Sequence, residues 1–430
     1  MTVWMLPIRT AATSKYNVNN KKVVLQAGLR TSLQYTVGIK MNFSIDAAYK
    51  SLNKIKEELC GDKVELLRTG DSDIMILADG MGSGVKANIL ATLTSKILGT
   101  MFLNGASIDD CIETIAKTLP VCQVRQIAYS TFSILQVSHN GQIYLAEFDN
   151  PSCIAIRKGE ILSLPFTERV LENKVIRECR FQAEQNDCFI LMSDGVIHAG
   201  VGNLLNFGWS WQNVAEYALT AAKETLSASR LANTLIKACD DLYMQLPGDD
   251  TTVAILRITK ARSIDLFTGP PYSPEDDTHL IHDFMYSQGK KIICGGTSAN
   301  IASRILKRSL VTSLNYTDPS LPPVANMEGI DLVTEGVLTL SRALTLIKQY
   351  KEGPVDEHFF EELDKDNGGS RVAKYIIEDC SILNLFVGKA MNEAHQNPSL
   401  PFNLSIRLHL VDQLKEAVTS IGKEVHIQYY

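Results

Sequence analysis

The chain has 430 residues, enough for two or three domains of average size. Hydrophobic residues make up 45% and charged residues 21%, which is typical of a globular protein and excludes a wholly disordered or collagen-like chain. No apolar run reaches the roughly 18 residues of a transmembrane helix. The formal net charge of -6 argues against a nucleic-acid binder, because neutralising phosphates requires clustered Lys and Arg. We therefore expect no nucleic-acid and no membrane partner.

The 9 cysteines are scattered, and no pair has the spacing Cys-x-x-Cys. A zinc ribbon or a dithiol redox site is therefore not predicted. Cys188, Cys239 and Cys294 lie inside apolar runs, where a buried, reduced thiol is expected. Together with the lack of a recognisable signal peptide, this pattern predicts a cytoplasmic protein.

Residues 1–40 contain several Lys and Arg but no Asp or Glu, and the first acidic residue is Asp46. Acid-poor segments of this kind include transit peptides, but no amphipathic helical stripe is clear here. We expect a basic N-terminal arm or extension, with Met41 as the natural start of the first folded domain.

Regular patterns begin after Asp46. A hairpin is predicted around Asn140-Gly141, which lies between two apolar runs. Ser107, with Asp110 three residues later, has the pattern of a capping box and predicts the start of a helix. Hairpin-linked strands mixed with helix pairs favour an α+β fold over residues 41–260. The expected helices are 47–57, 85–103, one from Ser107, 212–225 and 229–244, and the expected strands are 63–68, 73–78, 131–137, 142–147, 153–157, 161–164, 188–192 and 252–258.

The segment 269–274, Gly-Pro-Pro-Tyr-Ser-Pro, predicts a linker. After it, strands and helices alternate, which favours a separate α/β domain over residues 275–430. The expected strands are 291–294, 331–334, 404–410 and 424–429, and the expected helices are 298–306, 338–350 and 412–420.

Four aspartates in the first domain lie beside glycine at the ends of predicted strands: Asp62, Asp79, Asp194 and Asp249. A carboxylate at the end of a strand is held by a rigid element yet points outward. Hard divalent cations prefer such oxygen ligands. An Asp-Gly dipeptide alone is a common turn, but four aspartates in these positions predict a metal site.

The register of the first hairpin strengthens this prediction. If Gly70 and Asp71 form its two-residue turn, Asp62 lies directly opposite Asp79, with their Cβ atoms about 5 Å apart. Two carboxylates at that separation repel each other unless a cation lies between them. Asp71 is about 20 Å away along the strand, so we expect Asp71 and Asp73 to be turn-forming or solvated residues.

The order of these motifs resembles the metal-dependent type 2C protein phosphatases, in the branch named for stage II sporulation protein E. The motifs are Gly-Asp at 61–62, Asp-Gly-Met-Gly-Ser-Gly at 79–84, Ser-Asp-Gly at 193–195 and Gly-Asp-Asp-Thr-Thr at 248–252. The resemblance covers residues of about 45–258. It implies an α-β-β-α sandwich with a two-metal site at one edge, followed here by the separate α/β domain.

The resemblance also implies roles for individual residues. Asp62 and Asp79 would bridge or flank two Mn²⁺ or Mg²⁺ ions, with the Gly80 carbonyl as a further ligand. Asp194 and Asp249 would complete the shell of the second ion, with Asp250 as the alternative to Asp249. Two such ions clamp phosphoryl oxygens and activate a water molecule for attack on phosphorus.

Other residues are open to two interpretations. Gly82 and Gly84 either make room for a phosphate before the helix at Val85 or form a plain turn. Lys86 and Arg125 either contact the substrate or are solvated. His198 is either a general acid or, more commonly at such a position, structural.

The second domain offers one candidate site. Gly295, Gly296 and Thr297 link a strand to a helix, where backbone N–H groups could hold an anion. The alternative is a tight turn with a helix cap. If the strands before Gly295 and Glu335 are parallel neighbours, both turns lie at the sheet edge where open α/β sheets bind ligands. This placement predicts a regulatory or ligand-sensing domain.

The sequence thus favours a cytoplasmic serine/threonine protein phosphatase that hydrolyses phosphoserine or phosphothreonine on a partner protein. The alternative is a catalytically silent binding or regulatory module on the same fold. A third hypothesis places the main activity in the C-terminal domain. The sequence does not predict the oligomeric state.

Overall fold

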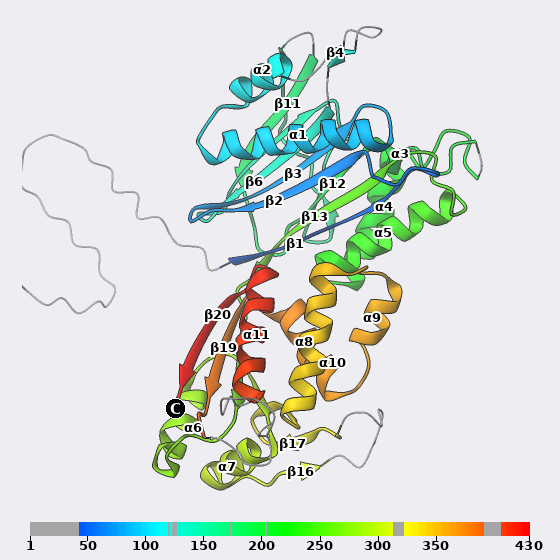
Figure 1. The fold of residues 1–430 in the computed structure, drawn as a ribbon. Helices are drawn as coiled ribbons and strands as arrows, with labels where there is room; N and C mark the ends of the chain where they lie inside the picture. Colours follow the sequence, from blue (N-terminus) through cyan, green and yellow to red (C-terminus); the bar gives the residue numbers. More distant parts are fainter. Residues whose placement is uncertain are drawn as a thin grey trace, which may run out of the picture. The chain divides into compact units, whose positions relative to one another are not determined.

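Two antiparallel sheets make up the first half of the protein (Figure 1). The computed structural model describes residues 43–118, 121–122, 127–128, 130–171, 174–202, 204–312, 322–390 and 406–430, so the predicted arm at 1–40 lies outside the described residues. The five-stranded sheet has the order β1 (Phe43–Leu52), β13 (Thr251–Lys260), β12 (Cys188–Met192), β8 (Ile154–Arg157) and β9 (Glu160–Ile161). The six-stranded sheet has the order β10 (Thr167–Leu171), β11 (Lys174–Gln182), β7 (Gln142–Phe148), β6 (Ser130–Ser138), β3 (Ser72–Gly80) and β2 (Asp62–Arg68). A separate pair joins β4 (Val121–Cys122) and β5 (Ile127–Ala128).

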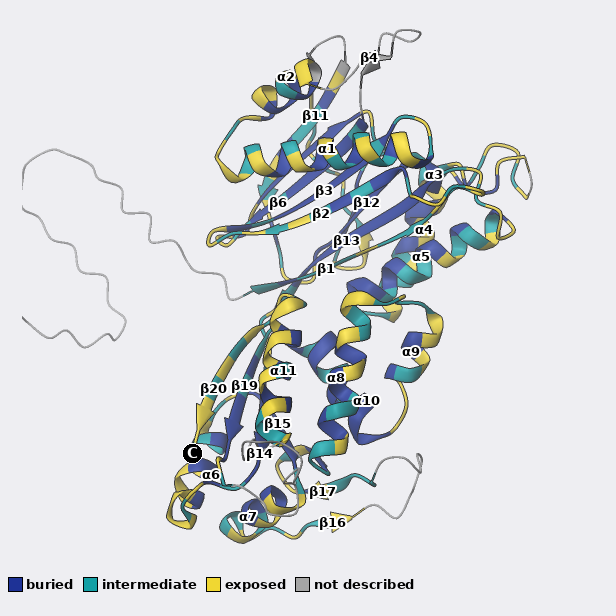
Figure 2. Ribbon diagram, in the orientation of Figure 1, coloured by how far each residue is buried: buried dark blue, intermediate teal, exposed yellow. Residues whose placement is uncertain are grey.

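The two sheets pack face to face with helices outside, so the predicted α-β-β-α sandwich is confirmed. Alternate residues of the strands point inward, and side chains such as Leu77, Leu135 and Leu256 fill the space between the sheets. Figure 2 shows this buried centre in dark blue. The six-stranded sheet packs on α1 (Gly84–Leu103) and α2 (Ile108–Thr118), and the five-stranded sheet on α3 (Asp194–Ile197), α4 (Trp211–Glu224) and α5 (Ala228–Leu242).

Local sequence signals place several of these elements. The capping box before α2 is present, because Ser107 N donates to Asp110 Oδ2 and Asp110 N donates to Ser107 Oγ, both at 3.2 Å. The hairpin around Asn140-Gly141 is also confirmed, and the strands on either side of Lys158-Gly159 pair with each other. In the first hairpin, Thr69 N donates to Ser72 O at 2.8 Å across the predicted turn.

Two parts of the sandwich differ from the sequence prediction. The helix expected over 47–57 is wrong, because this segment contributes to β1, which pairs along its whole length with the buried strand β13. That pairing outweighs the weak helical preference of a short alanine-containing segment. The sequence prediction also missed β10 and β11, which pair with each other and extend the six-stranded sheet from β7.

A third sheet forms the second half of the protein. It has the order β16 (Val311–Thr312), β17 (Ala325–Met327), β18 (Ile330–Thr334), β15 (Lys290–Cys294), β14 (Ser263–Thr268), β19 (Ile382–Val387) and β20 (Glu424–Tyr429). The five strands from β18 to β20 are parallel, as the predicted α/β domain requires. One face packs on α6 (Asp277–Tyr286) and α7 (Gly296–Leu306), preceded by a 3-10 turn η1 (Pro274–Asp276). The other face packs on α8 (Val337–Glu352), α9 (Glu357–Leu363), α10 (Gly368–Asp379) and α11 (Ile406–Ser420).

The predicted start of this domain at residue 275 is too late. Strand β14 precedes the Gly-Pro-Pro segment and pairs with both β15 and β19, so it is a central strand of the third sheet. The change from one sheet to the next falls between Lys260 and Ser263. We refer to residues 43–260 as the sandwich domain and to residues 263–430 as the C-terminal domain.

The strand predicted over 404–410 is also wrong. Ile406 begins α11, and the parallel strand of this part of the sheet is β19, which the sequence prediction missed. The apolar residues of this segment fit both periods, since every second residue is apolar and Leu410 and Leu414 are also one helical turn apart. Burial of Leu410, Val411 and Leu414 against the sheet decides for the helix. In the described residues, no helix is long and apolar enough to cross a membrane.

Candidate metal centre

The pairing of β2 with β3 brings two of the four predicted carboxylates together. Asp62 lies directly opposite Asp79, as the hairpin register predicts. Opposed residues in an antiparallel ladder have Cβ atoms about 5 Å apart. Asp62 is only 5% exposed, and neither of its carboxylate oxygens has a hydrogen-bond partner. Burying a carboxylate without a hydrogen-bond donor costs free energy, so this position favours a cation as the partner of Asp62.

The other two carboxylates extend from neighbouring strands of the second sheet. Strands β12 and β13 are antiparallel, so the end of β12, where α3 begins at Asp194, lies beside the start of β13, which Asp249 precedes. Ser193 joins the two segments, because its Oγ accepts from Thr252 N at 2.8 Å and its own N donates to Thr252 O at 3.0 Å. Each pair of aspartates therefore lies at one end of two neighbouring strands of one sheet.

The negative charges of the two pairs act on each other. Burial raises the pKa of Asp79 to about 9, and the negative charges of Asp62, Asp194 and Asp249 add to this shift. Burial is also the main cause that raises the pKa of Asp194, and the charge of Asp249 adds to it. The four aspartates are therefore near enough for their charges to interact, and a shared metal site stays a prediction.

Asp62 is the most enclosed member of this group. Burial raises its pKa to about 7, and the charges of Asp250 and Asp194 act in the same direction. Nearby hydroxyls of Ser193 and Thr252 partly offset the shift without making a hydrogen bond of ordinary geometry. The carboxylates therefore repel one another across a water-poor space, which a divalent cation would relieve.

Asp249 and Asp250 differ in their surroundings. Asp250 is 4% exposed, and its Oδ1 accepts from Lys54 N at 3.0 Å. Its Oδ2 lies against Gly61, where an added Cβ would be 2.7 Å away, so this carboxylate packs on backbone. Asp249 is half-buried, lies 3.7 Å from Lys54 Nζ, and acts on both Asp79 and Asp194. These surroundings favour Asp249 over Asp250 as the ligand, and the choice stays a prediction.

The donors fit a hard divalent cation. Both carboxylate oxygens of Asp62 are buried without hydrogen-bond partners, and carboxylates are the ligands that Mg²⁺ and Mn²⁺ prefer. Oδ2 of Asp250 is also buried without a partner, which keeps Asp250 as the alternative ligand to Asp249. Burial and the charge of Asp62 raise the pKa of the neighbouring Cys60 to about 12, so its thiol stays protonated. Among the described residues, no three His, Cys, Asp or Glu side chains already surround a common point, so ions would have to draw the carboxylates closer.

The glycine-rich loop after β3 is shaped by close packing. A Cβ on Gly80 would lie 2.0 Å from the Ala87 carbonyl oxygen, so only glycine lets α1 approach the strand end this closely. Gly84 begins α1 with a φ of +66°, and Ser83 Oγ donates to Glu57 Oε1 at 3.1 Å. Close packing and the positive φ are sufficient reasons for glycine at positions 80 and 84. Binding of a phosphate by this loop stays a prediction.

The structure does not decide the roles of the other residues that the sequence analysis considered. Lys86 is exposed on α1, and Arg125 falls outside the described residues. His198 is exposed at the end of α3, and its charge partly lowers the pKa of Asp194, whose overall shift is upward. The sequence prediction missed Lys54 and Tyr243, which contact this group of loops; no motif marks either residue.

The candidate anion site in the C-terminal domain has a partial structural basis. Strands β15 and β18 are parallel neighbours, so the turns at Gly295 and Glu335 do lie at one sheet edge. Gly295 N donates to Thr334 O at 2.9 Å, while the Glu335 carboxylate accepts from Val337 N and Leu338 N. The start of α8 is therefore already occupied by an acidic side chain. Anion binding at Gly295, Gly296 and Thr297 stays a prediction.

Comparison with known families agrees with the motif order. The family model of Stage II sporulation protein E matches residues 70–259. The predicted resemblance is thereby confirmed over residues 70–259, which contain three of the four aspartate motifs. No curated protein matches the chain.

Several solved structures match about half of the chain at low identity. The phosphatase domain with a fragment of the regulatory domain of SpoIIE from Bacillus subtilis is 19% identical, with a TM-score of 0.42; the match covers 50% of this chain and 64% of that one. RsbX in complex with magnesium is 20% identical, with a TM-score of 0.37, over 50% of this chain and 96% of that one. The serine/threonine phosphatase of S. agalactiae is 16% identical, with a TM-score of 0.37, over 50% of this chain and 99% of that one.

Proposed function

We propose that the sandwich domain is a metal-dependent serine/threonine protein phosphatase that acts on a phosphorylated partner protein. The observation that carries the proposal is the convergence of Asp62, Asp79, Asp194 and Asp249 on one group, with the oxygens of Asp62 buried and unpaired. The match of residues 70–259 to the sporulation phosphatase family supports the reaction class. We expect this activity in the cytoplasm.

The roles of the residues follow from their positions. Asp62 and Asp79, opposed on one hairpin, would hold both metal ions, with the Gly80 carbonyl as a further ligand. Asp194 and Asp249, beside strands of the other sheet, would complete the set of ligands around the second ion. When bound, two Mn²⁺ or Mg²⁺ ions supply Lewis acidity toward phosphoryl oxygens and an activated water molecule. The protein would contribute the strand ends and the start of α3 that hold the four carboxylates near one another.

Hydrolysis of a phosphoserine peptide by the full chain tests the proposal. We expect turnover with MnCl₂, none with EDTA, and a loss of at least about 100-fold in the variant Asp79→Asn. The matched control is Asp71→Asn, the same substitution at the exposed turn of the same hairpin, which should keep full activity. Metal-independent turnover, or full activity in Asp79→Asn, would contradict the mechanism.

The same experiment separates the alternatives. A silent binding module would bind Mn²⁺ or a phosphoprotein without turnover in the wild type. If the C-terminal domain carried the main activity, turnover would survive Asp79→Asn. No ligand aspartate of the motif order is missing, which favours the active enzyme. The C-terminal α/β domain would then have the regulatory or ligand-sensing role that its open parallel sheet suggests.

A further inference from the structure

The N-terminal turn of α5 contacts the C-terminal domain through one arginine. Arg230 Nη1 and Nη2 donate to the two carboxylate oxygens of Asp364 at 2.9 and 2.8 Å, and Arg230 Nε donates to Glu378. The guanidinium carbon also lies 4.6 Å from the ring centre of Phe360. Asp364 follows α9 and Glu378 belongs to α10, so a single side chain of the sandwich domain binds two helices of the other domain. Bidentate pairs of this kind combine strength with fixed geometry.

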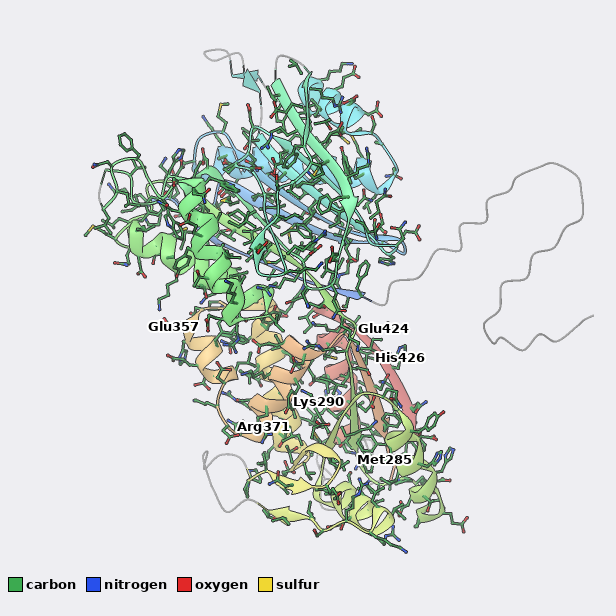
Figure 3. All side chains as sticks on the ribbon, turned by 180° about the vertical axis from the view of Figure 1, so that it is seen from behind. Met285, Lys290, Glu357, Arg371, Glu424 and His426 are labelled. Carbon is green, nitrogen blue, oxygen red and sulfur yellow. The ribbon has the colours of Figure 1, made fainter. Side chains whose placement is uncertain are left out.

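A second charged pair joins the same two elements. Lys237, two turns after Arg230 on the same helix, pairs with Glu357 of α9, which is labelled in Figure 3. Beside these pairs, a hollow of about 910 Å³ lies between α4, α5 and α9. Two basic side chains of α5 thus bind carboxylates of the C-terminal domain.

The other end of α5 reaches the candidate metal centre. Tyr243 caps the helix and is 4% exposed, and its hydroxyl donates to the Gly195 carbonyl at 2.7 Å. Gly195 follows Asp194 directly. On its other side, an added Cβ would lie 2.2 Å from the Asp250 carbonyl. The first turn of α3, which begins at Asp194, is thus held between the Tyr243 hydroxyl and the backbone of Asp250.

Helix α5 is one continuous element between these two contacts. Its 15 residues span about 22 Å at 1.5 Å per residue, and one face is buried against β1 and β13. Its first turn is capped, since Ala228 N donates to Asp46 Oδ2 at 2.8 Å and Arg230 N donates to Ser227 Oγ at 3.3 Å. Arg230 and Tyr243 therefore lie at opposite ends of one rigid helix.

We propose that α5 couples the C-terminal domain to the metal centre. Arg230 holds the helix against Asp364 and Glu378, and Tyr243 is a positioning residue that fixes the Gly195 carbonyl and so orients the Asp194 carboxylate. This inference rests on the proposed function, because it takes Asp194 as a metal ligand. Binding events or modifications that alter the C-terminal domain at α9 or α10 would change the affinity of the centre for its ions.

The experiment measures Mn²⁺ binding to the full chain by calorimetry, beside phosphopeptide turnover. Tyr243→Phe keeps the ring and removes only the donor, and we expect about five- to tenfold weaker Mn²⁺ binding. The backbone amides of Gly195 and Val196 should exchange faster, and kcat should fall while KM for the peptide is unchanged. Arg230→Ala should weaken Mn²⁺ binding about three- to fivefold, and Arg230→Lys should restore part of the loss.

Matched controls separate coupling from general damage. Tyr217→Phe removes a hydroxyl from α4, and Arg262→Ala breaks a comparable ion pair to Asp379 that does not involve α5. Both controls should bind Mn²⁺ like the wild type. Circular dichroism and thermal unfolding verify that each variant is folded.

The double variant Arg230→Ala/Tyr243→Phe decides whether the two residues act through one helix. Coupling predicts that its loss of Mn²⁺ affinity is smaller than the product of the two single losses. A loss equal to that product, or wild-type affinity in Tyr243→Phe, would overturn the inference while leaving the phosphatase proposal intact. If the wild type neither binds Mn²⁺ nor hydrolyses the peptide, both proposals are overturned.

Discussion

Neutralising one carboxylate of the metal centre should stabilise the metal-free protein. Asp79 has an ordinary pKa of 3.8, which burial and the neighbouring aspartates raise to about 9 in the folded state. The folded state therefore binds more protons than the unfolded state between these pH values, so stability falls as the pH rises through that window. The variant Asp79→Asn removes this dependence.

The size of the effect follows from the linkage relation. Each pH unit above the unfolded pKa costs about 1.4 kcal/mol, so the penalty at pH 7.5 has an upper limit of about 5 kcal/mol. Because solvent can relax around the partly exposed Asp79 carboxylate, the actual penalty is smaller than this limit. We expect the free energy of unfolding in EDTA to be about 2–5 kcal/mol larger for Asp79→Asn than for the wild type.

Urea unfolding monitored by circular dichroism, with EDTA and with MnCl₂, provides the assay. Mn²⁺ at 100 times its Kd should stabilise the wild type by about 2.7 kcal/mol and the variant by far less. Asp71→Asn, at the exposed end of the hairpin, should behave like the wild type in both buffers. Equal or lower stability of Asp79→Asn in EDTA, or equal stabilisation of the wild type and the variant by Mn²⁺, would refute the reasoning.

Three further predictions concern the sandwich domain. Burial raises the pKa of Glu147 from its ordinary 4.5 to about 7, so the wild type should lose stability as the pH rises from 4.5 to 7. Glu147→Gln lacks this dependence, and its free energy of unfolding relative to the wild type should rise by up to about 3 kcal/mol over that range, measured by urea unfolding. Ser107→Ala removes half of the capping box of α2 and should cost about 1 kcal/mol of unfolding free energy; an unchanged value would mean that the cap contributes nothing. Gly195→Ala places a Cβ 2.2 Å from the Asp250 carbonyl, so we expect a lower thermal midpoint and weaker Mn²⁺ binding. The control is Gly70→Ala, at a glycine that also lacks a positive φ and has no atom within 4 Å of the added Cβ; it should behave like the wild type.

Local chemistry made much of the sandwich domain predictable from sequence. The register of the first hairpin needed only its turn position and the two-residue period of a strand, and it placed Asp62 opposite Asp79. The capping box at Ser107 and the Asn140-Gly141 turn depend on neighbouring residues alone, and both are present. Such local motifs predict structure well because the residues that interact are already close along the chain.

Elements that depend on distant partners were predicted poorly. Strand β1 forms because β13, some 200 residues later, offers a long buried edge. The segment after Ile406 fits two periods, and only the sheet face beneath Leu410 and Leu414 selects the helix. Strand β14 precedes the apparent linker, yet it pairs in the centre of the third sheet.

The sequence by itself determined which oxygen-rich side chains stand at strand ends and in what order, because motif spacing is a property of the chain. Only the tertiary structure decided that the charges of the two pairs of aspartates act on each other, that Asp250 packs on backbone while Asp249 stays more open, and that Tyr243 and Arg230 lie at opposite ends of one helix between two sites. The physical reason is that these relations join residues far apart in sequence. They depend on how sheets and helices pack, which no local pattern encodes.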